Sequence, residues 1–291
     1  MSLDSFMAER TTAEGLLNLL QTFMQAGGLD EYDQEARQIL ETVLNCDYTG
    51  IRAGLVKDPT PEQIESAFKL AARRISGVPI AHLLGFAHFY GFVFKVAQGV
   101  LIPRAETEIL VKRAVEILGE RDWPEPHVLD LFTGCGNILL SIAATISISK
   151  GIGIDRDPIA IACANTNLDN FRFDHIEFLH WDVAKLLDGI DRRFHMVTAN
   201  PPYVPTSEIA GLQPEVSGHE NWTALDGGTD GLKYFRMMAT RIPNIICPGG
   251  CLLSEIGFGQ EKAVADIFSS WNHIDFIQDL NGIPRVLIAR P

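Results

Sequence analysis

Residues 127–137 read H-V-L-D-L-F-T-G-C-G-N, an apolar stretch followed at once by a turn with two glycines. A short apolar run that ends in glycine is typical of a buried β-strand. Gly134 and Gly136 allow the backbone to turn tightly and to approach a ligand closely. Because helical periodicity begins at Ile138, this stretch predicts a strand, a glycine turn and a helix in succession.

The same alternation continues toward the end of the chain. Strands are predicted at 127–132, 151–154, 176–179, 194–199 and 250–256, and helices at 138–144, 158–168, 230–241 and 260–268. Such alternation predicts an α/β fold with a mostly parallel, doubly wound sheet. Two further strand-like pieces, 274–278 and 285–289, flank Asn281-Gly282 and predict a hairpin that adds an antiparallel strand at the end.

The first part of the chain has a helical pattern instead. Apolar residues recur at helical spacing over 16–24, 36–44 and 64–75, and Thr60-Pro61-Glu62-Gln63 has the sequence of a capping box with proline at the first helical position. The aromatic stretch 89–96 predicts a hairpin turning at Gly91. We therefore expect a helical bundle over 1–85, a hairpin linker over 86–105 and a Rossmann-like domain over 106–291.

Composition limits the classes of function. The net charge is −13, whereas binding to a nucleic acid duplex normally needs a basic surface that neutralises phosphates. The five cysteines form no CxxC pair, so we expect reduced thiols and no metal site. The longest apolar stretch, 138–148, is too short to span a bilayer. These features predict a cytoplasmic protein without membrane or direct nucleic acid partners, and we expect a monomer.

The glycine turn predicts a cofactor with an adenosine part. Asp155 ends the second strand about 20 residues after the turn, where a carboxylate can bind ribose hydroxyls. A dinucleotide fingerprint would have a third glycine where Leu139 stands. Instead Asp130 precedes Gly134 by four residues, and this D-x-x-x-G-x-G pattern resembles that of class I methyltransferases. The resemblance implies S-adenosylmethionine as the cofactor and a contact of Asp130 with its methionine part.

The fourth strand ends in Asn200-Pro201-Pro202-Tyr203, at the edge of the sheet where the cofactor's methyl group would lie. An amide or aromatic amino nitrogen is a poor nucleophile, because its lone pair is delocalised. The Asn200 side-chain oxygen and the Pro201 carbonyl can accept its hydrogens, and two prolines stiffen the loop that holds them. Tyr203 can pack on the substrate plane. We therefore expect these four residues to be catalytic.

Nearly the whole chain resembles the HemK/PrmC family of protein-(glutamine-N5) methyltransferases. The resemblance rests on the stretches 73–80, 84–85, 89–91, 100–108 (V-L-I-P-R-A-E-T-E), 224–232 (A-L-D-G-G-T-D-G-L) and 255–260 (E-I-G-F-G-Q), besides the glycine turn, Asp155 and Asn200–Tyr203. It implies methyl transfer from S-adenosylmethionine to the glutamine of the Gly-Gly-Gln loop of peptide chain release factors, leaving S-adenosylhomocysteine. It also implies that the N-terminal helical domain helps to bind the release factor.

By position, the resemblance implies one set of cofactor-binding residues and one set that holds the glutamine amide, Asn200 to Tyr203. The cofactor-binding residues are Asp130, Phe132, Thr133, Gly134, Cys135, Gly136, Asp155, Asp182, Val183 and Asn200. The chain departs from the family pattern at Cys135, Asn137, Val183 and Asn221. Methylation of glutamine in another protein, such as a ribosomal protein, stays open, as do an adenine-N6 methyltransferase and a cofactor-binding module without activity.

Overall fold

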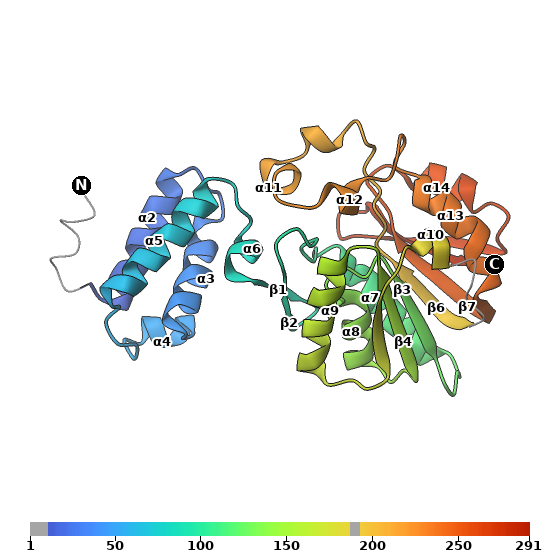
Figure 1. Cartoon of the computed structure of the whole chain (residues 1–291), viewed down its shortest axis with the longest axis horizontal. Coiled ribbons are helices and arrows are strands. Elements are labelled where there is room, and N and C mark those ends of the chain that lie inside the picture. The colour runs from blue at the N-terminus through green and yellow to red at the C-terminus, as the bar shows by residue number, and fades with distance from the viewer. Residues whose placement is uncertain (1–10, 187–192) are drawn as a thin grey trace. The chain divides into compact units, whose positions relative to one another are not determined.

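The computed structural model describes residues 11–186 and 193–291 of the chain. Its contacts divide the chain into two compact units, Met1–Leu84 and Gly85–Pro291. The described part of the first unit is helical, and the second unit holds all the described strands, in a seven-stranded sheet and a small hairpin (Figure 1).

The first unit is a helical bundle, as predicted. Its helices are α2 (Ala13–Ala26), α3 (Tyr32–Leu44), α4 (Tyr48–Arg52), α5 (Pro61–Ile75) and α6 (Ile80–Leu84). Leu16 and Leu20 of α2 pack in one core with Ile39 and Leu40 of α3. The predicted capping box is present at the start of α5, where Thr60 and Gln63 each bind the other's backbone N–H. The apolar periodicity and the capping residues therefore indicate the same bundle.

The sheet of the second unit has the strand order β5-β4-β3-β6-β7-β9-β8. The strands are β3 (His127–Leu131), β4 (Lys150–Asp155), β5 (Ile176–His180), β6 (Phe194–Ala199), β7 (Ile246–Glu255), β8 (His273–Gln278) and β9 (Pro284–Arg290). β5, β4, β3, β6 and β7 pair in parallel, and β9 pairs antiparallel with both β7 and β8. The predicted mostly parallel sheet with a terminal hairpin is confirmed.

The two strands of the terminal hairpin do not join the sheet in chain order. The last strand of the chain, β9, lies between β7 and β8, and β8 forms the edge. Burial gives the physical reason: Val286 to Ala289 are all buried, whereas His273, Asp275 and Gln278 of β8 are exposed. The more apolar strand of the hairpin therefore takes the inner position, and the strand with exposed polar residues takes the edge.

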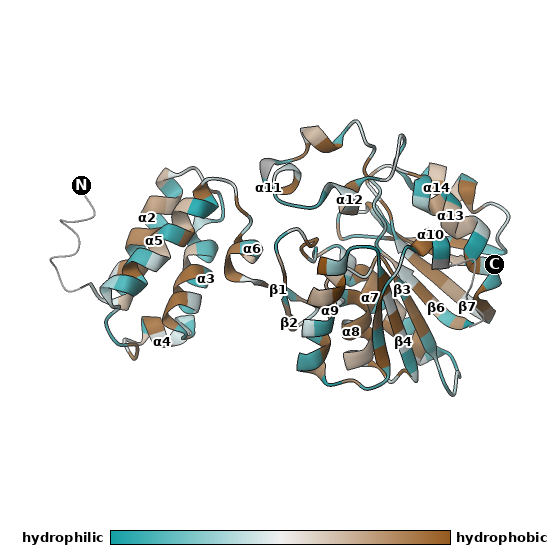
Figure 2. Cartoon of the chain, in the orientation of Figure 1, coloured by the Kyte–Doolittle hydropathy of each residue, from teal (hydrophilic) through white to brown (hydrophobic). Residues whose placement is uncertain are grey.

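Helices cover both faces of the sheet (Figure 1). Val128 belongs to a core with residues of α7, α8 and α9, and its neighbour Leu129 to a core with residues of α13 and α14. Successive side chains of a strand point to opposite faces, so a strand covered on both faces is mostly apolar (Figure 2), with the buried Asp130 of β3 as an exception. The helices of this unit are α7 (Thr107–Glu120), α8 (Asn137–Thr145), α9 (Pro158–Phe171), α10 (Val183–Leu186), α11 (Pro214–Ser217), α12 (Trp222–Leu225), α13 (Lys233–Arg241) and α14 (Glu261–Ile267).

The segment expected as a hairpin linker forms β1 (Phe86–Phe89) and β2 (Phe92–Lys95), an antiparallel pair. Tyr90 and Gly91 both have positive φ, at 50° and 77°, as the two-residue turn of a twisted hairpin requires. Phe89 and Phe94 are buried in the core of the second unit. No helix among residues 11–186 and 193–291 has the length and apolar character to cross a membrane.

Candidate active site

The glycine turn after β3 is tied to the end of the neighbouring strand β4. The Thr133 N–H donates to the Ile154 carbonyl at 3.0 Å, and the Gly134 N–H donates to Asp155 Oδ2 at 3.0 Å. Gly134 has φ 55°, and a Cβ built on it would meet nothing within 4 Å. The turn is therefore anchored on one side and open on the other, which leaves its backbone accessible to a ligand.

Asp155 ends β4 beside this turn, as the sequence predicted. Its second oxygen, Oδ1, accepts the N–H of Asp157 at 2.9 Å, so two backbone amides fix the carboxylate in place. Burial raises the pKa of Asp155, and these two amides oppose that shift. A carboxylate oxygen can accept more than one hydrogen bond, so Asp155 retains capacity for hydroxyl groups of a ligand.

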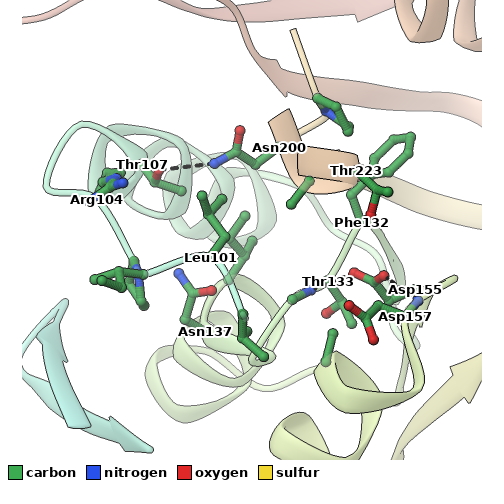
Figure 3. A pocket seen from close by; sticks show the side chains of 18 of the residues that line it. Leu101, Arg104, Thr107, Phe132, Thr133, Asn137, Asp155, Asp157, Asn200 and Thr223 are labelled. Atoms are coloured by element: carbon green, nitrogen blue, oxygen red, sulfur yellow. Dashed lines mark hydrogen bonds between the residues drawn. The ribbon is translucent and has the colours of Figure 1, made fainter. Parts of the chain in front are cut away.

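The turn and Asp155 border a cavity of about 740 Å³, counting space open to solvent (Figure 3). The lining comes from residues 99–104 with Thr107, residues 132–134 with Asn137 and Ile138, residues 155–157 with Ala160, and Asn200, Pro202, Thr223 and Ala224. The wall therefore combines carboxylates and amides with apolar side chains.

Asp130 does not line this cavity, although it was predicted to contact the cofactor. It is fully buried, and its two oxygens accept the hydroxyls of Thr133 and Thr198, each at 2.6 Å. Burial raises the pKa of the Asp130 carboxyl to about 7. The Asp130 carboxyl therefore links Thr133 of the glycine turn to Thr198 of β6 and holds the turn against the sheet.

Of the other predicted cofactor residues in the glycine turn, some line the cavity and some do not. Phe132, Thr133 and Gly134 line the cavity. Cys135 and Gly136 do not: the Cys135 side chain is fully buried in the core, and a Cβ on Gly136 would meet the Phe178 ring at 2.7 Å. The glycine at 136 is therefore needed for close packing of the turn on β5.

Asp182 and Val183, the remaining pair of predicted cofactor residues, also lie outside the lining of the cavity. Asp182 accepts the N–H of Ala184 at 2.9 Å at the start of α10, and Val183 is buried in a core cluster. The departure from the family pattern at Val183 therefore falls on a packing position in this structure.

Asn200 lines both the first cavity and a second one of about 620 Å³, counting space open to solvent. Both cavities are lined by Leu101, Arg104, Asn200 and Ala224. The second cavity is further lined by Pro201, Tyr203, Val204, Leu212, Val216, Glu220, Leu225 and Glu255. The four predicted catalytic residues thus come together at one place, with Asn200 at the junction and Tyr203 on the second side.

A chain of hydrogen bonds holds the Asn200 side chain. Its Nδ2 donates to Thr107 Oγ1 at 3.3 Å, and the Thr107 hydroxyl donates to Glu255 Oε2 at 2.5 Å (Figure 3 shows the first of these bonds). The Tyr203 hydroxyl donates to the other oxygen of Glu255 at 3.2 Å. Glu255 is buried at the end of β7, and burial raises its pKa while both hydroxyls oppose the shift.

The backbone of the Asn200–Tyr203 loop is clamped from the side of α14. Gln260 Nε2 donates to the Tyr203 carbonyl at 2.9 Å, and Gln260 Oε1 accepts the Gly257 N–H at 2.9 Å. Gly231 lies against the same carbonyl, since a Cβ built on it would come within 2.3 Å of the Tyr203 oxygen. The stretches 224–232 and 255–260 therefore have a common structural task, which is to fix this loop.

The segment after the loop is tied to residues 225–228. Val204 donates to the Leu225 carbonyl at 2.9 Å and accepts the Gly227 N–H at 2.8 Å. Asn221 accepts the Thr223 N–H at 3.0 Å as the N-cap of α12, and its Nδ2 donates to Asp157 Oδ2 at 2.9 Å. The departure at Asn221 therefore provides a bond between this segment and the edge of the first cavity.

Several lining residues were not among the site residues predicted from the sequence. These are Leu101, Thr107, Asn137, Arg156, Asp157, Thr223, Ala224 and, on the second side, Glu220 and Glu255. Glu220 is buried, and it pairs with Arg104. The signal that could have found some of them is the 100–108 stretch, which contains Leu101 and Thr107. No cluster of potential metal-ligating residues is present in the described ranges.

Comparison with known proteins agrees with this geometry. The family model for a methyltransferase domain matches residues 124–255, and the model for the PrmC N-terminal domain matches residues 16–85. The solved structure of the T. thermophilus 16S rRNA N2 G1207 methyltransferase, in complex with AdoMet and guanosine, has a TM-score of 0.50 and 18% identity, over 70% of this chain and 49% of that chain. The second unit therefore has the fold of a class I methyltransferase.

Two curated relatives define the family more narrowly. The release factor glutamine methyltransferase of Geobacter sulfurreducens is 33% identical, over 96% of each chain. That of Thermodesulfovibrio yellowstonii is 36% identical, over 88% of this chain and 92% of its own. This chain belongs to the release factor glutamine methyltransferase family, as the resemblance implied.

Proposed function

We propose that this protein transfers a methyl group from S-adenosylmethionine to the side-chain amide nitrogen of the glutamine in the Gly-Gly-Gln loop of peptide chain release factors. The observation that carries the proposal is the orientation of Asn200 at the junction of two cavities. The Asn200 side-chain nitrogen donates a hydrogen bond to Thr107, so the side-chain oxygen is available to accept a hydrogen bond from a substrate. Family membership supports the choice of substrate.

The residues of the first cavity fit the proposed cofactor. S-adenosylmethionine carries ribose hydroxyls, an apolar adenine ring and a charged amino acid end. Asp155 can accept from hydroxyls, the open backbone at Gly134 allows close approach, and Val100, Ile138 and Ala160 offer apolar surface. When bound, the cofactor would supply an electrophilic methyl group on a sulfonium.

The second cavity is proposed as the site of the glutamine side chain. Asn200 Oδ1 and the Pro201 carbonyl would each accept an N–H of the substrate amide, which orients its nitrogen toward the first cavity. Two acceptors also favour a more electron-rich nitrogen, because they polarise its N–H bonds. The amide proton can leave to solvent after the transfer, so the chemistry needs no strong base. The acceleration would come chiefly from positioning and fixed dipoles.

The other properties follow from this proposal. The described residues that line both cavities all belong to the second unit, and we propose that the enzyme acts as a monomer. Release factors work with the ribosome, which would make this enzyme cytoplasmic. The net charge of −13 also favours a protein substrate over a nucleic acid.

The decisive experiment uses S-adenosylmethionine labelled in the methyl group and a release factor from the same organism. We expect label on the wild-type release factor and none on a version whose loop glutamine is changed to asparagine or alanine. Label that persists in both versions would contradict transfer to this glutamine. No label on either, with label appearing on another protein of the cell extract, would favour a different glutamine-bearing protein.

A binding experiment tests the first cavity separately. We expect Asp155→Ala to weaken S-adenosylmethionine binding by about 10- to 100-fold, because hydrogen bonds from hydroxyls to a half-buried carboxylate are worth roughly 1.5–3 kcal/mol. Isothermal titration with the cofactor measures this directly. Asp174→Ala, at a fully exposed carboxylate, is the matched control. Equal affinity of Asp155→Ala and wild type would refute the proposed ribose contact.

A further inference from the structure

The bonds of Thr107 and Glu255 determine which way the Asn200 amide faces. Asn and Gln amides have nearly the same shape after a rotation that exchanges nitrogen and oxygen, so packing alone selects poorly between the two orientations. A hydrogen-bonded partner that can only accept, or only donate, selects between them. Thr107 Oγ1 is the described partner of the Asn200 side chain.

The single hydroxyl proton of Thr107 is committed elsewhere. The hydroxyl donates to Glu255 Oε2 at 2.5 Å, and the Tyr203 hydroxyl donates to the other oxygen of the same carboxyl group, so both oxygens of Glu255 act as acceptors. Thr107 therefore donates to Glu255 and has only lone pairs left for Asn200. A lone pair requires an N–H, which turns Asn200 Nδ2 toward Thr107 and Oδ1 away from it, as Figure 3 shows.

The Tyr203 hydroxyl is bound to the same carboxylate. It donates to Glu255 Oε1 at 3.2 Å, so both oxygens of Glu255 receive a proton from the loop or its support. In the chain of bonds from Asn200 through Thr107 to Glu255, each group donates toward Glu255. Such a chain polarises the Asn200 amide, so its oxygen, Oδ1, becomes a stronger acceptor.

We propose that Thr107 and Glu255 are positioning residues that fix the Asn200 amide with its oxygen toward the substrate. The inference rests on the proposed function and deepens it, since it assigns a task to two residues that are 148 positions apart in sequence. The opposite orientation would present N–H groups of Asn200 to the N–H groups of the substrate amide, and the nitrogen of the substrate would lose its acceptor.

Substitutions at Thr107 separate this role from packing. Thr107→Val keeps the shape and removes the hydroxyl, whereas Thr107→Ser keeps the hydroxyl. The N-cap of α7 makes no side-chain bond, and Thr107 follows it, so neither change removes a helix cap. We expect Thr107→Val to lower kcat by about tenfold or more while KM and cofactor affinity change less than about twofold, since the orientation matters most in the transition state. Thr107→Ser should restore kcat.

A second readout does not depend on activity. In protein labelled with ¹⁵N asparagine, the Asn200 side-chain N–H that binds Thr107 should exchange slowly with solvent in wild type and Thr107→Ser. It should exchange rapidly in Thr107→Val. The resonance is assigned by its absence from the spectrum of Asn200→Ala. Thr166→Val, at an exposed helix position, controls for the loss of a threonine hydroxyl.

Glu255→Leu carries the same test if Thr107→Val does not fold. It removes both acceptors, so the Thr107 proton is no longer committed, and we expect reduced kcat and faster exchange of the Asn200 N–H. Wild-type kcat together with wild-type exchange in either folded variant would overturn the inference. If the wild-type enzyme fails to methylate the release factor, the proposed function falls, and the exchange measurement still decides whether Thr107 and Glu255 orient Asn200.

Discussion

Asn200 is the residue on which the proposed chemistry depends most directly. It follows immediately after the last residue of β6, and its side-chain N–H donates a hydrogen bond to Thr107. Its oxygen is an acceptor whose position is set before any substrate arrives. Because preorganised dipoles do not have to reorient during a reaction, such an acceptor contributes most in the transition state.

We therefore expect Asn200→Ala to reduce kcat for release factor methylation by at least about a hundredfold. Cofactor affinity should change little, since Asp155 and the glycine turn remain. Single-turnover methylation and cofactor titration on the same preparation measure the two effects. Asn165→Ala, at an exposed position of α9, serves as the control. Turnover by Asn200→Ala within a few-fold of wild type would remove Asn200 from the mechanism.

Asp130 leads to a prediction about pH. Burial raises its pKa from 3.8 to about 7, so the folded protein holds the proton more tightly than the unfolded chain does. Its contribution to the free energy of unfolding is therefore highest at low pH and falls as the pH rises from about 4 to about 7, by at most roughly 1.4 kcal/mol per pH unit.

Asp130→Asn should remove this pH dependence. The difference in unfolding free energy between the variant and wild type should shift in favour of the variant from pH 4 to pH 7 and then level off. Urea unfolding at several pH values measures it, with Asp174→Asn at a fully exposed site as the control. A difference that is constant over this range would show that Asp130 does not titrate there.

At the scale of elements, local sequence patterns predicted those strands and helices that are set by apolar periodicity and capping residues. The strand from 194 to 199 and the helix after Pro158 follow from apolar runs and capping residues, and both were predicted closely. The bond between Thr107 and Glu255 joins residues from distant elements, so no local pattern indicates it. Asp130 was predicted to contact the cofactor, whereas the structure buries it in β3 with bonds to Thr133 and to Thr198 of β6. The bond to Thr198 depends on a strand residue 68 positions further along the chain, so the sequence around Asp130 does not indicate it.

The loop Asn200–Tyr203 depends on α14 and on the segment around Gly231 for its position. Prolines restrict the torsions of the loop, but they do not fix where it lies. Gln260, next to the start of α14, bonds both to the Tyr203 carbonyl and to Gly257. The Gln260 side chain, which lines neither cavity, therefore fixes the position of the loop through the Tyr203 carbonyl.

We expect Gln260→Ala to lower kcat by about tenfold, because a small displacement of a catalytic group is enough for such a loss. Stability should fall by roughly 1–2 kcal/mol through the two lost bonds. Methylation kinetics and thermal unfolding measure both. Gln278→Ala, at an exposed position of β8, is the control. A Gln260→Ala enzyme with lower stability but unchanged kcat at a temperature where it is folded would contradict the clamp.

At the scale of the whole chain, chemistry and substrate recognition are proposed to belong to different units. Asp155, Asn200, Thr107 and Glu255 all lie in Gly85–Pro291. The first unit has its own core, built around Leu16, Leu20 and Ile39, and residues 16–85 match the PrmC N-terminal domain. None of its described residues lines either cavity, and the family resemblance implies that this unit binds the protein substrate.

A chain reduced to residues 85–291 should therefore bind S-adenosylmethionine with nearly the affinity of the full protein. Its kcat/KM for an intact release factor should fall by at least about tenfold, which corresponds to only about 1.4 kcal/mol of lost binding. A short peptide that contains Gly-Gly-Gln is the matched substrate, because it is too small to use a second binding surface, and its kcat/KM should be the same for both chains. Equal kcat/KM on the intact release factor would contradict a recognition role for the first unit, whereas loss of cofactor binding would contradict the independence of the second.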